Sequence, residues 1–111
     1  MNVCENEIRD AVEAELIAAN EKYPPFASLH EAYAVILEEY EEADDELMAC
    51  DEFIQDVWRY TKEDNTQGAL EAFKYLKHRA EHLAQEACQM AAMANKAEQS
   101  FADKMNLENL K

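Results

Sequence analysis

The sequence has very few residues that break helices. It contains one glycine, Gly68, and only two prolines, the adjacent Pro24 and Pro25. Inside a helix, glycine is less favourable than alanine by about 1 kcal/mol and proline by about 3 kcal/mol, and turns depend on both residues. Their scarcity excludes a fold with many turns and predicts an all-α protein built from long helices.

Basic residues are scarce as well. Lys and Arg total 10 against 25 Asp and Glu among 111 residues, which gives a formal net charge of -15. Such a surface repels a phosphate backbone, so the composition argues against nucleic-acid binding through basic contacts. Two explanations of the acidity remain: a surface that keeps the protein in solution, or carboxylates gathered around a cation.

Long apolar runs and paired cysteines are also lacking. No run approaches the roughly 20 apolar residues that span a bilayer, and no apolar stretch follows the acidic N-terminus, so neither membrane insertion nor export is expected. The three cysteines, Cys4, Cys50 and Cys88, are odd in number and form no Cys-x-x-Cys pair. We interpret them as thiols in a reducing compartment and expect a cytoplasmic protein.

The pattern predicts three helices. The first runs from about residue 5 to 21 and ends ahead of the extended Tyr23-Pro24-Pro25 connector. The second begins at Ser28, because Ser28-Leu29-His30-Glu31 matches the Ser-x-x-Glu capping box, and continues to about residue 60. The third follows a turn at residues 62–68 and ends near residue 101, before a polar tail that is expected to fray. Asp64, Asn65 or Thr66 can cap it.

The second helix carries two stripes, each with spacings of three and four residues. One stripe is a heptad seam of Leu29, Tyr33, Ile36, Tyr40, Ala43, Leu47, Cys50, Ile54 and Val57. The other is Ala32, Val35, Glu39, Glu42, Glu46, Ala49 and Phe53. We expect a single domain over residues 1–111. Because one antiparallel helix cannot cover both stripes, we also expect this domain to form helical bundles by oligomerisation.

The second stripe is apolar at its ends and acidic in the middle. Carboxylates in register with core-type residues are costly to bury unless protons, basic side chains or a metal compensate them. If the third helix packs antiparallel to the second, Glu86 can face Glu39 and Glu42. Arg79 and Lys96 lie seven residues before and ten after Glu86, on about the same face. Carboxylates with basic neighbours suit a magnesium ion and the phosphate that it binds.

Two segments of the sequence resemble the MazG-like nucleoside triphosphate pyrophosphohydrolases. The stretch from Tyr23 to Glu42 looks like the front half of that family, and Glu86-Ala-Cys-Gln-Met-Ala-Ala-Met-Ala looks like its back half. The family signature is Glu-Glu-x-x-Glu on one helix and Glu-x-x-Asp on the next. Here Glu38, Glu39 and Glu42 match the first part, whereas in the second part Glu86 is followed by Gln89 in place of aspartate.

The resemblance implies a cytoplasmic, phage-type or bacterial hydrolase, a homodimer or homotetramer, that converts a nucleoside triphosphate into a monophosphate and pyrophosphate. It implies that Mg²⁺ is held by the matching acidic side chains, with Gln89 as a neutral ligand: Glu38, Glu39, Glu42, Glu86 and Gln89. Glu38 and Glu39 are then also expected to orient or deprotonate the attacking water, and Arg79 and Lys96 to meet phosphate. Glutamine brings no charge, so it weakens metal binding and the activation of water.

Other interpretations of these residues stay open. A run of acidic side chains on a helix often simply faces water, and Arg79 and Lys96 can pair with surface glutamates one turn away. The chain can therefore also be a MazG-like relative that binds a nucleotide or metal without turnover. A third alternative is a non-catalytic acidic helical module that binds a basic host protein or mimics the charge of a nucleic acid.

Overall fold

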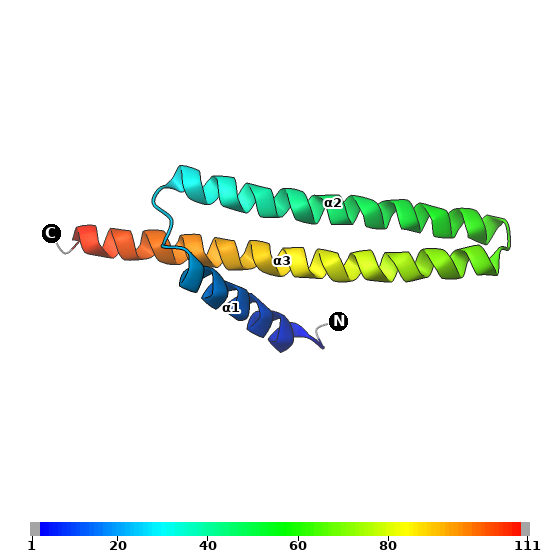
Figure 1. Ribbon diagram of the computed structural model, residues 1–111, viewed down its shortest axis with the longest axis horizontal. Coiled ribbons are helices and arrows are strands. Elements are labelled where there is room, and N and C mark those ends of the chain that lie inside the picture. The colour runs from blue at the N-terminus through cyan, green and yellow to red at the C-terminus, as the bar shows by residue number, and fades with distance from the viewer. Residues whose placement is uncertain (1–2, 110–111) are drawn as a thin grey trace. The chain divides into compact units, whose positions relative to one another are not determined.

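The structure is a computed structural model that describes residues 3–109, and these residues form three α-helices and no strand (Figure 1). Helix α1 spans Glu5–Lys22, α2 spans Leu29–Lys62 and α3 spans Thr66–Asn109. The predicted all-α class is confirmed. None of the helices within residues 3–109 is long and apolar enough to cross a membrane.

Helix α3 is longer than the sequence predicted. It continues past residue 101 to Asn109, through the polar segment that was expected to fray. No glycine or proline follows Gly68, and Ala102, Lys104 and Met105 all have good helix propensity. Polarity alone therefore did not mark the end of this helix.

The chain divides into two compact units. One consists of the chain up to Tyr40 together with the chain from Ala87 onward, and the other is Glu41–Glu86. Helices α2 and α3 each contribute a part to both units. Whether the protein behaves as one domain therefore stays a prediction.

In the unit of residues 41–86, a tight turn makes α2 and α3 antiparallel (Figure 1). The Asn65 amide donates to the Tyr60 carbonyl and the Asp64 amide to the Thr61 carbonyl, and Asp64 has a positive φ of 51°. This is the Schellman ending of a helix, in which a left-handed residue satisfies the last carbonyls. Asn65 then caps α3, because its Oδ1 accepts the Gly68 amide at 3.0 Å.

The buried face of α2 draws on both stripes. In the stripe with the acidic centre, Ala32 is buried, Glu42 is exposed, and the other members are half-buried: Val35, Glu39, Glu46, Ala49 and Phe53. The heptad seam, in contrast, leaves these large side chains exposed on α2: Leu29, Tyr33, Tyr40, Leu47 and Ile54. From the seam, Ala43 and Cys50 are buried, and Ile36 and Val57 are half-buried. The apolar pattern predicted the helix but did not distinguish the face that covers α3.

The other unit holds α1 and the connector against α3. Phe26, in the connector, is 7% exposed, and its amide donates to Ser100 Oγ at 3.1 Å. Ser100 Oγ in turn donates to the Lys96 carbonyl at 2.8 Å. Among the side chains that the structure describes, the buried ones in this unit's helices are Leu16 of α1, Ala32 of α2, and Ala92 and Lys96 of α3. The double proline leads into this anchored segment, so its rigidity fixes where α2 begins.

Ser28 begins α2 as the capping box predicts. Its Oγ accepts the Glu31 amide at 3.1 Å, and its carbonyl accepts the Ala32 amide at 3.1 Å. The cap fixes the rotation of the first turn of α2, and with it the face on which Val35 and Glu39 follow.

Candidate metal centre

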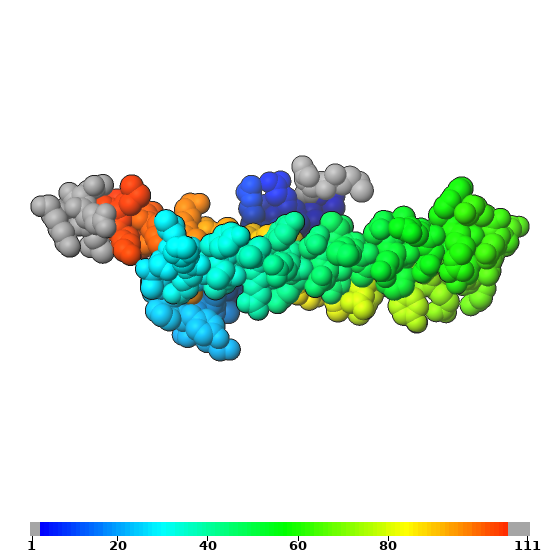
Figure 2. Space-filling model, turned by 90° about the horizontal axis from the view of Figure 1, so that it is seen from above, coloured from blue at the N-terminus to red at the C-terminus, as the bar shows by residue number. Residues whose placement is uncertain are grey.

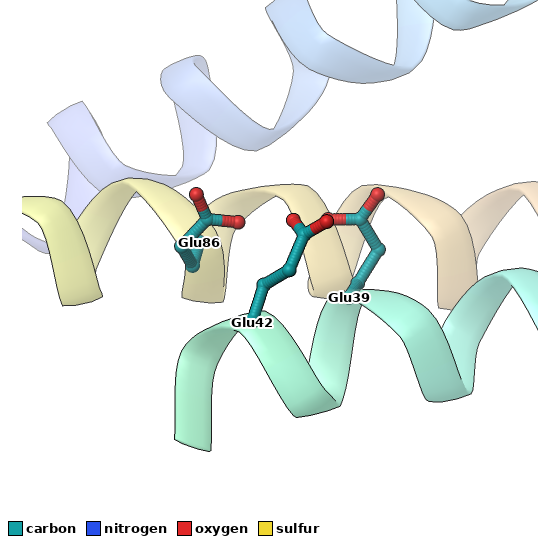
Figure 3. A group of neighbouring side chains, drawn as sticks. All are labelled: Glu39, Glu42 and Glu86. Atoms are coloured by element: carbon teal, nitrogen blue, oxygen red, sulfur yellow. The ribbon is translucent and has the colours of Figure 1, made fainter. Parts of the chain in front are cut away.

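Three glutamates place carboxylate oxygens close together. Glu39, Glu42 and Glu86 each offer one oxygen, and these three oxygens lie within 4.8 Å of one another. Figure 3 shows the Glu39 and Glu42 side chains rising from α2 and the Glu86 side chain from α3. Glu39 and Glu86 are half-buried, and Glu42 is exposed.

Helical spacing explains the pair on α2. Residues three apart in a helix lie on the same face, so Glu39 and Glu42 point in about the same direction. The sequence expectation that Glu86 faces these two residues is met by the three-carboxylate group. Glu39 and Glu86 each take part in at least one further interaction of a kind that includes hydrogen bonds, ion pairs and electrostatic contacts.

The spacing of the oxygens fits one hard cation. Magnesium binds oxygen at about 2.0 to 2.1 Å in an octahedron, which places neighbouring ligands about 3 Å apart and opposite ligands about 4.2 Å apart. Three oxygens within 4.8 Å therefore need to move by less than about 1 Å to share an ion. Hard carboxylate oxygens suit Mg²⁺ and Ca²⁺ better than softer metals.

A pocket of about 550 Å³ borders Glu39 within the unit that contains α1. Side chains from all three helices and the connector line it: Glu15, Ala18, Ala19, Lys22, Tyr23, Pro24, Phe26, Glu31, Val35, Glu38, Glu39, Gln89, Met93 and Lys96. Four of the residues singled out from the sequence, Glu38, Glu39, Gln89 and Lys96, thus share one pocket.

Lys96 is a buried cation in the wall of this pocket. Only 4% of the residue is exposed, and its ammonium lies 5.0 Å from the centre of the Phe26 ring and 5.8 Å from that of Tyr23. A cation over an aromatic face is stabilised by the negative potential of the ring, by about 2 kcal/mol where water is excluded. Lys96 therefore does not occupy the solvated helix surface that its charge suggests.

Arg79 has a different partner. Its guanidinium lies 3.4 Å from the Glu46 carboxylate, and His82 Nδ1 lies 3.7 Å from the same carboxylate. The Arg79 side chain is 44% exposed, so the ion pair contributes less than about 1 kcal/mol. This contact joins α2 to α3 and is not the pairing one turn away on the same helix that was left open from the sequence.

The predicted site residues thus separate into three groups. Glu39, Glu42 and Glu86 form the carboxylate group; Glu38, Gln89 and Lys96 line the pocket; and Arg79 pairs with Glu46. Glu38 is exposed and is not among the three clustered carboxylates of the described residues. Its expected role as a metal ligand stays a prediction, as does that of Gln89.

The sequence pattern of α1 and of the aromatic connector indicated no part in a binding site. Glu15, Lys22, Tyr23 and Phe26 nevertheless line the pocket beside Glu39. The available signal was the conjunction of Tyr23, the double proline and Phe26 directly before a capped helix, which indicates an anchored connector. Nothing in the spacing of α1 alone indicated that it borders a pocket.

No protein-family model, no curated protein and no solved structure matches this chain.

Proposed function

We propose that the protein is a magnesium-dependent nucleoside triphosphate pyrophosphohydrolase of the MazG-like type. The observation that supports this most directly is the convergence of Glu39, Glu42 and Glu86, whose carboxylate oxygens lie within 4.8 Å of one another. Carboxylates this close to one another repel, and a divalent cation bound by all three would offset that repulsion. The adjoining pocket provides space for the organic part of a nucleotide.

The proposed reaction adds water across the bond between the α and β phosphates and yields a monophosphate and pyrophosphate. Bound to the three carboxylates, Mg²⁺ would offset phosphate charge and lower the pKa of a bound water. Glu38 adjoins Glu39 in the sequence, faces solvent and lines the pocket. It suits the role of the carboxylate that accepts the proton of the attacking water, because it stands outside the three clustered ligands.

A substrate panel tests this proposal. Pyrophosphate release is measured from ribonucleoside and deoxyribonucleoside triphosphates with Mg²⁺, for the wild-type protein and for Glu39→Gln and Glu41→Gln. Glu41 is exposed, carries the same charge and is outside the clustered group, so its variant is the matched control. We expect turnover by the wild type and the control, and a loss of at least a hundredfold in Glu39→Gln. No turnover of any triphosphate by folded wild-type protein rejects the proposal.

Gln89 favours one second candidate, a relative that binds nucleotide or metal without hydrolysing it. Glutamine stands where the MazG-like signature has aspartate, and it lines the pocket next to the position of Glu86 on α3. A neutral ligand lowers both metal affinity and the acidity of bound water. If the wild type is inactive and Gln89→Asp releases pyrophosphate, the non-hydrolysing candidate is the correct one.

We also propose that the working form is a homodimer or homotetramer. The exposed part of the α2 seam within residues 41–86 includes Leu47 and Ile54, which are 55% and 53% exposed, and Trp58, at 60%, lies one turn beyond Ile54. Figure 2 shows this part of α2, in green, with no other segment lying over it on the side seen. A contiguous apolar strip on a helix is typical of an interface, and a second α2 is its most direct complement.

A further inference from the structure

The pocket beside Glu39 is far larger than a metal ion requires. Its volume of about 550 Å³ falls within the range of roughly 300 to 1,000 Å³ that is usual for sites that bind small organic molecules. Apolar side chains form one part of its wall, among them Val35, Met93, Phe26 and Tyr23. An occupant that complements this wall has an apolar, flat face as well as polar edges.

The charges that line the pocket disfavour a phosphate group there. Four glutamates, Glu15, Glu31, Glu38 and Glu39, face two lysines, Lys22 and Lys96. At this balance a polyanion is repelled, whereas a neutral heterocycle is not. Gln89, one of the expected metal ligands, lines the same pocket seven residues before Lys96 on α3. Seven residues correspond to about 10 Å, or two helical turns, so Lys96 lies away from the metal-binding end of the pocket.

Lys96 instead stands beside the aromatic wall. Its ammonium is 5.0 Å from the Phe26 ring centre and 5.8 Å from the Tyr23 ring centre, and the residue is only 4% exposed. A planar base that stacks on Tyr23 brings its edge within hydrogen-bond reach of an ammonium at that position. An ammonium only donates hydrogen bonds, so the edge that it meets has to be an acceptor.

We infer that this pocket holds the nucleobase of the substrate and that Lys96 is a specificity-determining residue which donates a hydrogen bond to a carbonyl oxygen of the base. The inference takes its ligand class, a nucleotide, from the proposed function. The preferred substrates are then nucleotides of uracil, thymine, guanine or cytosine, all of which carry a ring carbonyl. Adenine carries none: its acceptors are ring nitrogens, and where guanine has its carbonyl oxygen adenine presents an amino group, a second donor, to the lysine.

Binding of nucleoside monophosphates without magnesium tests this inference separately from catalysis. Dissociation constants are measured by calorimetry for dUMP, dGMP and dAMP, with inorganic tripolyphosphate as a probe for phosphate alone. We expect the wild type to bind dUMP or dGMP at least tenfold more tightly than dAMP, since a hydrogen bond to a charged donor typically discriminates by ten- to a hundredfold.

Three variants separate the role of Lys96 from a structural one. Lys96→Met keeps the apolar stem of the side chain and removes the donor. The dissociation constants for dAMP and for dUMP or dGMP should then differ by less than about threefold, while the affinity for dAMP changes little. Lys77→Met, at an exposed lysine of α3, is the control and should keep the wild-type preference. Tyr23→Ala, at a side chain with 58% exposure, should weaken every monophosphate about tenfold because it removes the stacking surface.

Two results with Lys96→Met overturn the inference. A ratio that stays unchanged in Lys96→Met shows that the lysine does not read the base, and equal weakening of tripolyphosphate shows that it contacts phosphate. If Lys96→Met fails to fold, Lys96→Gln and Lys96→Arg replace it: Lys96→Arg keeps a charged donor and should keep a carbonyl preference, Lys96→Gln should lose most of it, and equal preference in both contradicts the inference. Monophosphate binding with the expected preference but no pyrophosphate release rejects the hydrolase and leaves the base pocket in place. Pyrophosphate release without any carbonyl preference supports the hydrolase and rejects the role of Lys96 in reading the base.

Discussion

Replacing Glu42 with glutamine should change stability in opposite directions with and without magnesium. Glu42 is the exposed member of the three-carboxylate group, so Glu42→Gln changes its charge without disturbing a packed side chain. In water, two unit charges 4.8 Å apart repel by about 0.9 kcal/mol, and the substitution removes two such repulsions. After screening by salt, the variant should be more stable than the wild type by about 1 kcal/mol when no metal is bound.

Magnesium should reverse this order. A ligand that binds only the folded protein stabilises it by about 1.4 kcal/mol when its free concentration is ten times the dissociation constant. The wild type should gain this stability, whereas Glu42→Gln, with one charged ligand fewer, should gain little. The melting temperature is measured by circular dichroism in chelator and in magnesium, and 1 kcal/mol corresponds to roughly 4 to 8 °C for a domain of this size.

The control for this experiment is Glu41→Gln, which changes the net charge equally at an exposed position outside the group. Its melting temperature should respond to magnesium as the wild type does. An equal magnesium response in Glu42→Gln, or a loss of stability of that variant in chelator, would contradict the proposal that the three carboxylates are poised for one cation.

Three further predictions address the turn, the ion pair and the exposed seam. Asp64→Gly should raise the free energy of unfolding by about 0.5 to 1 kcal/mol in urea titrations, because glycine adopts the φ of 51° without a steric penalty. Arg79→Ala should lower it by less than about 1 kcal/mol, and the loss should shrink in high salt. Ile54→Lys should shift the mass measured by light scattering toward the monomer, while Lys74→Glu should not; unchanged mass in both variants contradicts association through α2.

The sequence determined the helices themselves. With one glycine and two adjacent prolines, the chain has few places to turn, and Ser28 and Asn65 mark two of the helix starts through local hydrogen bonds that need no tertiary contact. It also indicated the acidic stripe, because the period of a helix places Glu39 and Glu42 on one face whatever packs against it. The end of α3 was the exception, since the polar segment after residue 101 is helical.

Tertiary structure alone decided which members of the two α2 stripes are covered and what surrounds Lys96. Both stripes of α2 have helical period and apolar ends, so periodicity cannot choose between them; the rotation of α2 about its axis, which depends on packing against α3, leaves Tyr40 and Leu47 exposed. Lys96 is buried because the connector brings Phe26 to Ser100, 74 residues away. Contacts of that sequence separation follow from the packing of whole helices, and no local pattern encodes them.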